Sequence, residues 1–177
     1  MNDDPSHSRR SRASVAVAML APEWRRTLPD AARIARRAAR AALAGSPASA
    51  QPVEVSLALA DDNRIRDLNR NHRGRNEPTN VLAFVGGPPT DPRQPWWLGD
   101  VVLARETILA EAAAQGKSVG QHMSHLVIHG VLHLLGFDHK TDRQARRMER
   151  LETDLLARLG VPDPHRSHRR PRSRKHR

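Results

Sequence analysis

Three histidines between residues 129 and 139 have the type and spacing of ligands to a single metal ion. His129 and His133 are four positions apart, so on a helix their imidazoles lie on the same face, one turn above each other. Gly136 follows them, and glycine readily adopts the positive φ that ends a helix and reverses the chain. Such a reversal would bring His139 back as a third nitrogen ligand. The segment therefore predicts a three-histidine metal site.

Other histidines on the same helical stripe leave a second pairing open. His122 and His125 precede His129 at helical spacing, so spacing alone also permits a pair formed by His125 and His129. The glycine and the third histidine favour the set that ends at His139. Three protein ligands with an open fourth position are typical of a catalytic zinc, whereas a structural zinc usually has four. We therefore expect one Zn²⁺ ion in a metal-dependent enzyme, although nickel would also accept three imidazoles.

The spacing H-x-x-x-H-x-x-G-x-x-H is shared with metzincin proteases, which carry a glutamate as general base directly after the first histidine. In this chain that position is Gly130, which cannot accept a proton. Asp138 is close in the sequence, but it adjoins a ligand and is equally suited to orienting an imidazole. A zinc metalloprotease-like hydrolase is therefore the second interpretation.

Several ordered motifs resemble those of the YbeY family of bacterial endoribonucleases. Residues 129–139 are similar to the family signature H-G-x-L-H-L-x-G-x-D-H. The other matching segments are residues 68–74, 78–84, 98–102 and 148–152, the last of these resembling a helix motif M-E-x-x-E. The similarity runs from about Val53 to Pro164. His72, Asn76, Ala83 and Val85 depart from the family pattern, which puts in doubt only details of the loop after Arg73.

The resemblance implies a single-strand-specific endoribonuclease that acts in the maturation of ribosomal RNA. It implies an rRNA precursor as substrate, and it makes the small ribosomal subunit a candidate partner. Arg73 matches the family's active-site arginine. Its planar guanidinium can pair with phosphate through two hydrogen bonds, so we expect Arg73 to bind the scissile phosphate.

Phosphodiester cleavage would use the open coordination position of the metal. Zinc can bind a phosphoryl oxygen as a Lewis acid or lower the pKa of a bound water. The sequence does not identify the general base, because His72, Asp138 and His125 each remain candidates. Asp100 is better explained as a structural carboxylate of its strand.

Length and composition limit the remaining possibilities. The 177 residues fit one domain with a sizeable core, and the absence of cysteine excludes disulfides and thiolate ligands and agrees with a cytoplasmic protein. No apolar run reaches membrane-spanning length. Seven of the net +11 charges belong to residues 165–177, which leaves +4 for residues 1–164. We expect a disordered lead-in over 1–12, a single domain over 13–164, and a disordered basic tail over 165–177 that contacts RNA phosphates.

Two segments near the N-terminus each have two interpretations. Residues 9–21 combine arginines with a short apolar run, as a signal peptide does, but the run alternates large residues with alanine, which favours a strand. A helix is expected from Pro29 to Gly45. The arginines that share its polar face are Arg33, Arg36, Arg37 and Arg40. Such a face suits solvent and RNA equally.

Hydrophobic periodicity predicts the remaining elements. Further strands are expected over residues 53–60, 80–85 and 98–104, and helices over residues 61–71, 105–115, 119–135 and 141–159. Residues 86–95 are rich in glycine and proline and predict a loop, which Trp96 and Trp97 close. The order of elements favours an α+β fold: a small mixed sheet of about four strands with helices packed on it. The metal site would lie on a helix and the turn that follows it.

Three classes of function are therefore in competition. A zinc-dependent endoribonuclease is the first and a metalloprotease the second. The third is a non-catalytic RNA-binding factor of ribosome assembly, in which the metal mainly stabilises the fold.

Overall fold

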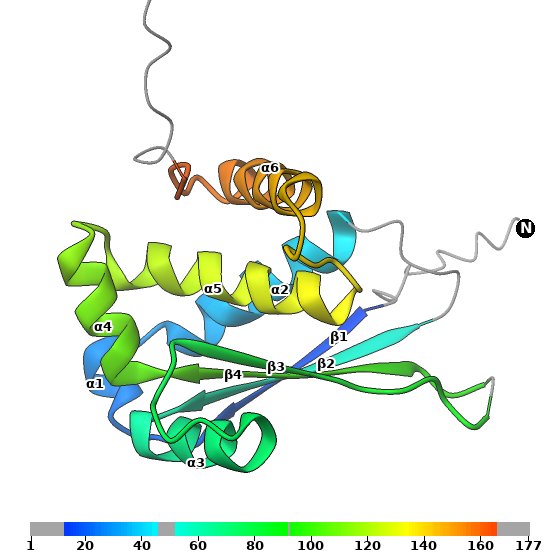
Figure 1. Cartoon of the computed structure of the whole chain (residues 1–177), viewed down its shortest axis with the longest axis horizontal. Helices are drawn as coiled ribbons and strands as arrows, with labels where there is room; N and C mark the ends of the chain where they lie inside the picture. Colours follow the sequence, from blue (N-terminus) through cyan, green and yellow to red (C-terminus); the bar gives the residue numbers. More distant parts are fainter. Residues whose placement is uncertain (1–12, 46–51, 92, 166–177) are drawn as a thin grey trace, which may run out of the picture.

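A four-stranded mixed sheet forms the centre of the molecule, and helices cover both of its faces (Figure 1). The computed structural model describes residues 13–45, 52–91 and 93–165. The strands, in spatial order, are β1 (Ala13–Met19), β2 (Val53–Ala60), β4 (Trp96–Ala104) and β3 (Val81–Val85). β1, β2 and β4 run parallel, and β3 pairs antiparallel with β4 as an edge strand. The predicted α+β class is confirmed.

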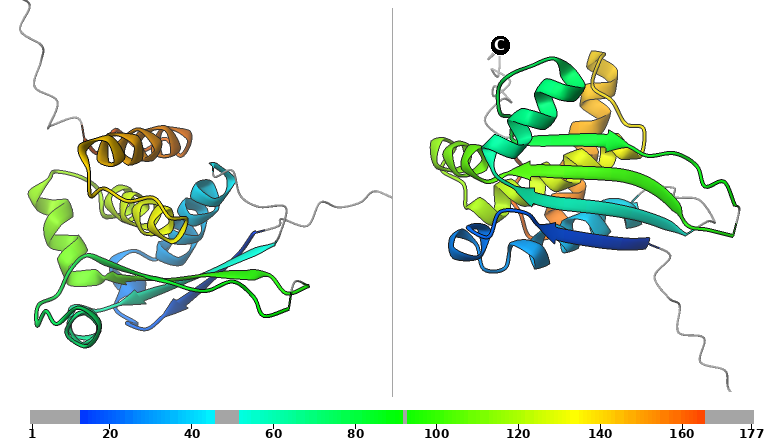
Figure 2. Two further views of the ribbon diagram at one scale, coloured as in Figure 1. Left: turned by 45° about the vertical axis from the view of Figure 1, so that its right-hand side comes forward. Right: turned by 90° about the horizontal axis from the view of Figure 1, so that it is seen from below.

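Helices lie in two layers above one face of the sheet and in a single layer below it. α2 (Ala31–Gly45) and α5 (Val119–Leu134) pack directly on the upper face, and α6 (Asp142–Arg158) lies above α5. α3 (Asp62–Arg73) covers the opposite face next to β3 and β4 (Figure 2). The two shorter helices are α1 (Trp24–Thr27) and α4 (Arg105–Ala114).

Most predicted elements are confirmed to within two residues, and the exceptions have physical causes. Trp96 and Trp97 belong to β4 and not to the preceding loop, because they pair with Val53 and Glu54 of β2. The short helix α1 was not predicted, since four residues are too few to show a helical period. It is fixed by Trp24, which is fully buried and donates its indole N–H to the carbonyl of Ala60 at 2.9 Å.

The alternating run near the N-terminus is strand β1, as the periodicity predicted. α2 turns a row of alanines toward the core, and such small side chains let it approach the sheet and α5 closely. The buried alanines are Ala31, Ala35, Ala38, Ala39 and Ala42. Arg33, Arg37 and Arg40 lie on the exposed face, whereas Arg36 is half-buried and donates from Nε to the carbonyl of Val15 at 3.4 Å. The predicted polar face is thus confirmed for three of its four arginines, and its contact with RNA remains a prediction.

The start of α3 is tied to the start of α4. Asp61, at the predicted start of this helix, is the N-cap and accepts a hydrogen bond from the backbone N–H of Arg64 at 2.8 Å. The Asp62 carboxylate accepts from both the N–H and the hydroxyl of Thr107, while the N–H of Asp62 donates to Glu106. These reciprocal bonds hold α3 against the end of β4. Its last residue, Arg73, therefore lies at the end of an anchored helix and not in a loop.

α5 lies close against the sheet at Gly130. A Cβ atom added there would lie 2.7 Å from Cγ1 of Val101 on β4, closer than real side chains approach. Val101 is fully buried in the main core, so it has little room to move away. The glycine therefore sets the depth at which α5 sits on the sheet.

Among the described residues, no helix combines the length and the apolar character that a membrane span requires.

We predict that Gly130→Ala lowers the free energy of unfolding by about 1–3 kcal/mol through overpacking, despite alanine's better helix propensity. Gly120→Ala on the same helix is the matched control, because its Cβ would meet only the flexible end of Ile34 at 3.3 Å. Urea titrations of both variants measure the difference. In a Val101→Ala background the loss of unfolding free energy caused by Gly130→Ala should largely vanish. An unchanged loss there would show that the contact with Val101 is not the cause.

Candidate metal centre

α5 is an apolar helix with one polar stripe. Its N-terminus is fixed by a capping box, in which the Ser118 hydroxyl accepts from the N–H of Gln121 and the Gln121 side chain accepts from the N–H of Ser118. Most of its residues are buried in the core, including Val127, Ile128 and Val131. The four histidines of the helix recur along one side at helical spacing; His122 is buried, and the other three are half-buried.

The turn after α5 reverses the chain as the glycine predicted. Gly136 has φ +85°, and its N–H bonds to the carbonyl of His133. The N–H of Phe137 bonds to the carbonyl of Leu132, the six-to-one bond of a Schellman motif. Two residues later comes His139, before a capping box at Thr141 starts α6. Backbone hydrogen bonds therefore fix the near side of the turn, and the side-chain bonds of the capping box fix its far side.

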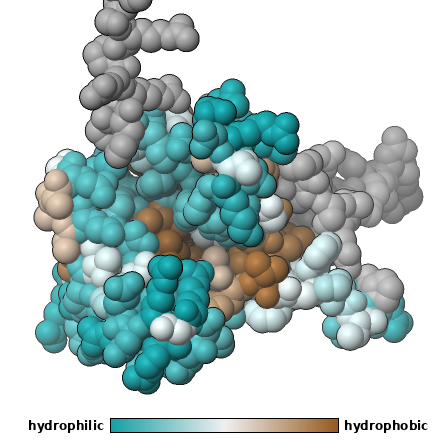
Figure 3. All heavy atoms as spheres, in the orientation of Figure 1, coloured by the Kyte–Doolittle hydropathy of each residue, from teal (hydrophilic) through white to brown (hydrophobic). Residues whose placement is uncertain are grey.

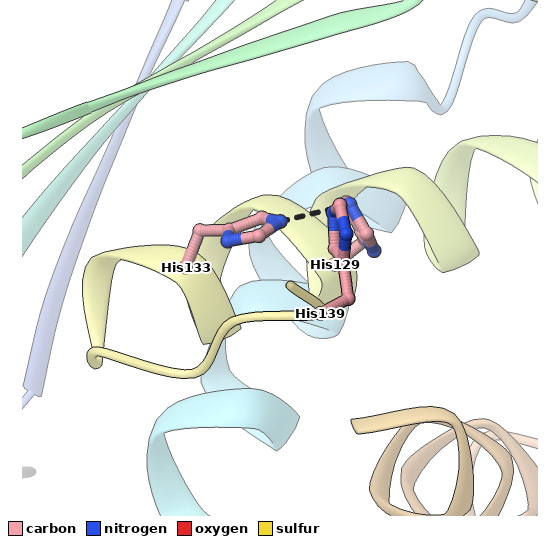
Figure 4. Close-up of side chains that lie close together, drawn as sticks. All are labelled: His129, His133 and His139. Carbon is pink, nitrogen blue, oxygen red and sulfur yellow. Dashed lines mark hydrogen bonds between the residues drawn. The ribbon is translucent and has the colours of Figure 1, made fainter. Parts of the chain in front are cut away.

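The three predicted ligands converge. His129 and His133 project from α5, and His139 comes back to them from the turn (Figure 4). Nε2 of His129 lies 3.1 Å from Nε2 of His133, and all three residues offer a ring nitrogen within 4.8 Å of one another. At 3.1 Å either a shared proton or a metal ion can bridge the two nitrogens, and three converging imidazoles are a donor set that fits a metal ion preferring nitrogen ligands.

Electrostatics favour the form of His133 that binds metal. Burial lowers the pKa of His133, and the neighbouring rings of His129 and His139 lower it further, against the opposing hydrogen bond with the backbone of Phe137. A lowered pKa keeps the ring neutral near pH 7, and the neutral imidazole is the form that coordinates metal ions.

A buried glutamate behind this triad was not identified from the sequence. Glu152 of α6 is only 2% exposed, and one of its carboxylate oxygens lies 2.7 Å from Nδ1 of His129. Its other oxygen contacts Nε2 of His125 at 3.2 Å and Nε2 of His165 at 2.7 Å. Burial raises the pKa of Glu152, but the hydrogen bonds from His125 and His129 outweigh this and hold the pKa well below its ordinary value.

A second cluster of ligand-type atoms results from these contacts, since His125, Glu152 and His165 also offer atoms within 4.8 Å of one another. His165, the first residue of the predicted basic tail, contacts Glu152; residues 166–177 of that tail and residues 1–12 lie outside the described residues. A signal for Glu152 exists in the sequence. Glu152 falls on the apolar stripe of α6 with Met148, Leu155 and Leu156, a position that a solvated glutamate would not take.

A cleft of about 600 Å³ opens over the triad. The three histidines form one part of its lining, the β3 residues Val81, Ala83 and Val85 form another, and Arg73 at the end of α3 lies at its border. In the space-filling view, apolar surface lies in a hollow flanked by hydrophilic surface (Figure 3). Arg73 and the triad thus share one cleft although more than fifty residues separate them in the sequence.

The other residues considered as metal ligands or general bases lie in different surroundings. His125 turns to Glu152 and does not line this cleft, so the structure gives no support to the alternative pairing of His125 with His129 as ligands. His72 packs edge-on against Phe84 at 5.0 Å between ring centroids. Asp138 lines the cleft, but a hydrogen bond from Lys140 and one from the N–H of His139 lower the pKa of Asp138, which makes it a weaker base. Asp100 lies on β4 outside the cleft lining.

A further polar network holds one wall of the cleft. The side-chain amide of Asn80, just before β3, donates to both oxygens of Glu111 on α4, at 3.1 and 3.0 Å. Glu111 also contacts Nε2 of the buried His122 at 2.7 Å. These bonds join α4, α5 and the start of β3 beside the metal centre.

The sequence profile described as Endoribonuclease YbeY matches residues 23–160. This chain belongs to the YbeY family. The Endoribonuclease YbeY of Paramagnetospirillum magneticum is 48% identical over 155 residues, which cover 85% of this chain and 94% of that protein. The protein of the same name from Azorhizobium caulinodans is 50% identical over 139 residues, which cover 78% of this chain and 87% of that protein. The family match begins about thirty residues before Val53, where the resemblance in the motifs began.

Family membership and packing together explain Gly130. The position that would carry the metzincin glutamate has no space for a side chain, because Val101 lies directly behind it. The YbeY signature H-G therefore corresponds here to close packing of the helix on the sheet.

We predict that His133→Ala lowers the bound metal from about one ion per chain to nearly none, because two remaining imidazoles bind far more weakly than three. His72→Ala is the matched control, since this histidine is exposed and lies outside the cleft. Elemental analysis of both purified variants, beside the parent protein, measures the effect. Equal metal content in all three would remove His133 from the ligand set.

Proposed function

We propose that this chain is a single-strand-specific, metal-dependent endoribonuclease of ribosomal RNA maturation. One Zn²⁺ ion would be held by His129, His133 and His139, and Arg73 would bind the scissile phosphate. The observation that carries the proposal is the shared cleft: a three-histidine donor set and an exposed arginine line it together in a member of the YbeY family.

The ion and the arginine have complementary tasks. A bound Zn²⁺ supplies Lewis-acid stabilisation of the negative charge that gathers on the phosphate during cleavage. The Arg73 guanidinium orients the same phosphate through paired N–H donors and neutralises part of its charge. Arg73 is exposed at the cleft border, so its donors are accessible to a nucleic acid strand.

The cleft also suits a single strand in size and surface. Its volume of about 600 Å³ is within the usual range for small-molecule sites, enough for a few unpaired nucleotide groups. Apolar side chains of β3 could contact bases while Arg73 and Lys140 contact the backbone. We propose rRNA precursors as substrates, the small ribosomal subunit as a partner and the cytoplasm as the location, with the basic tail adding phosphate contacts.

The two other classes of function make different predictions. A metalloprotease lacks its general base here because Gly130 has no side chain, so we expect no hydrolysis of casein. A non-catalytic assembly factor would bind RNA whether or not metal is present and would not cleave it. A chelator that abolishes cleavage but leaves folding and RNA binding intact therefore supports the enzyme over the factor.

We predict that Arg73→Ala lowers the rate of single-stranded RNA cleavage by about 100- to 1000-fold while the metal content stays unchanged. Arg70→Ala is the matched control: it removes an arginine from the same helix, one turn earlier, whose guanidinium pairs with Asp67 at 3.1 Å. Arg70→Ala should retain near-full activity. Cleavage of a fluorescent single-stranded RNA, with elemental analysis of each preparation, measures both properties.

His133→Ala serves as the metal-free reference in the same assay. Equal trace cleavage by the parent protein, Arg73→Ala and His133→Ala would identify a contaminating nuclease and favour the binding-factor function.

A further inference from the structure

Glu152 is a buried carboxylate in contact with three imidazoles, two from α5 and one from the segment after α6. It projects from α6 and is 2% exposed. Its Oε1 lies 2.7 Å from Nδ1 of His129, while its Oε2 lies 3.2 Å from His125 and 2.7 Å from His165. His125 precedes His129 by one turn of α5, and His165 follows α6. Each of these three distances is that of a hydrogen bond.

The carboxylate determines which ring nitrogens carry hydrogen. An ionised carboxylate has only acceptors, so each nitrogen that contacts it at these distances must donate an N–H. His129 is therefore protonated on Nδ1, and its Nε2 carries a free lone pair. That Nε2 is the atom 3.1 Å from Nε2 of His133. The contact with Glu152 thus presents the correct nitrogen of His129 to the metal centre.

We propose that Glu152 is a positioning residue of the metal centre. Its Oε1 fixes His129 in the tautomer and ring orientation that coordinate the metal, and the N–H groups of His125 and His165 satisfy its Oε2. The proposal rests on the ligand set proposed above. A ligand that donates its second nitrogen to a carboxylate is held in place and is a better electron donor to the metal.

A second ion could in principle be held by His125, Glu152 and His165, because their ligand atoms lie close enough to one another. The contacts favour hydrogen bonds instead. Both rings approach the single atom Oε2, so every contact pairs a donor with an acceptor and needs no cation. In the triad, by contrast, all three groups are imidazoles, and Nε2 of His129 and Nε2 of His133 lie 3.1 Å apart with either a proton or a metal ion able to bridge them. We therefore expect one ion per chain, and a second one is an outcome of the test.

The tautomer of His129 can be measured in the parent protein. Long-range ¹H–¹⁵N correlation spectra of the metal-free protein at mildly alkaline pH report which ring nitrogen bears hydrogen, and the spectrum of His129→Ala identifies the signals. We expect hydrogen on Nδ1 of His129. Hydrogen found on Nε2 would overturn the proposal whatever the variants do.

Metal affinity tests the consequence. Glu152→Gln keeps the side-chain length but removes the charge, and we expect zinc to bind about 10- to 100-fold more weakly in competition with a chromophoric chelator. Glu149→Gln is the matched control, since it removes an exposed carboxylate from the same helix one turn earlier. Its affinity should equal that of the parent protein. Equal affinities for both variants, with Glu152→Gln folded by circular dichroism, would overturn the positioning role.

Two further variants separate the remaining outcomes. If His129→Ala binds zinc as tightly as the parent protein, the ligand set itself is wrong, which is a failure of the proposed function and not of Glu152 alone. Metal stoichiometry is compared between the parent protein and His165→Ala. One ion per chain in both supports the hydrogen-bonded network. Two ions in the parent and one in His165→Ala would overturn it and make the cluster a second metal site.

Discussion

The close packing of α5 on the sheet is the constraint on which the rest of the structure depends. Helices and sheets pack at a distance set by the side chains between them, and at Gly130 there is none. The helix can therefore sit on Val101 with its apolar residues buried on both sides. His129 lies directly before this contact and His133 one turn after it, so the depth of the helix fixes the depth of the metal centre. A helix held further from the sheet would move both imidazoles away from β3 and Arg73.

The same close packing leaves a row of histidines on α5 that need hydrogen-bond partners. Imidazoles on a largely buried helix lose water and must find hydrogen bonds within the protein. Acidic residues from the neighbouring helices supply them, Glu111 for His122 and Glu152 for His125 and His129. A single carboxylate that accepts hydrogen bonds from three imidazoles is stabilised although it is buried. α6 is thus joined to α5 through the polar groups behind the metal centre as well as through its apolar face.

The sequence predicts those parts of the structure that depend on local geometry. The four-residue spacing of His129 and His133, the reversal at Gly136 and the N-cap at Asp61 each follow from a few adjacent residues, and each is present. The partner of His129 lies 23 residues further along the chain, and the M-E-x-x-E motif does not say which glutamate points inward. The apolar neighbours of Glu152 on α6 do indicate it. Trp96 was assigned to a loop because prolines precede it, yet pairing with β2 outweighs that local signal.

The two halves of the cleft are positioned by different interactions. The triad depends on α5 and its turn, and its ligands contact one another directly. Arg73 instead depends on α3, whose first turn is bonded to Thr107 and Glu106 at the start of α4. α4 follows β4 without a break, and β4 pairs with β3, which forms the cleft wall between the two halves. The distance between Arg73 and the three histidines is therefore set through the sheet. Changes in α3 can shift Arg73 while leaving the histidines in place, so the phosphate binding and the metal binding that we propose are separable by mutation.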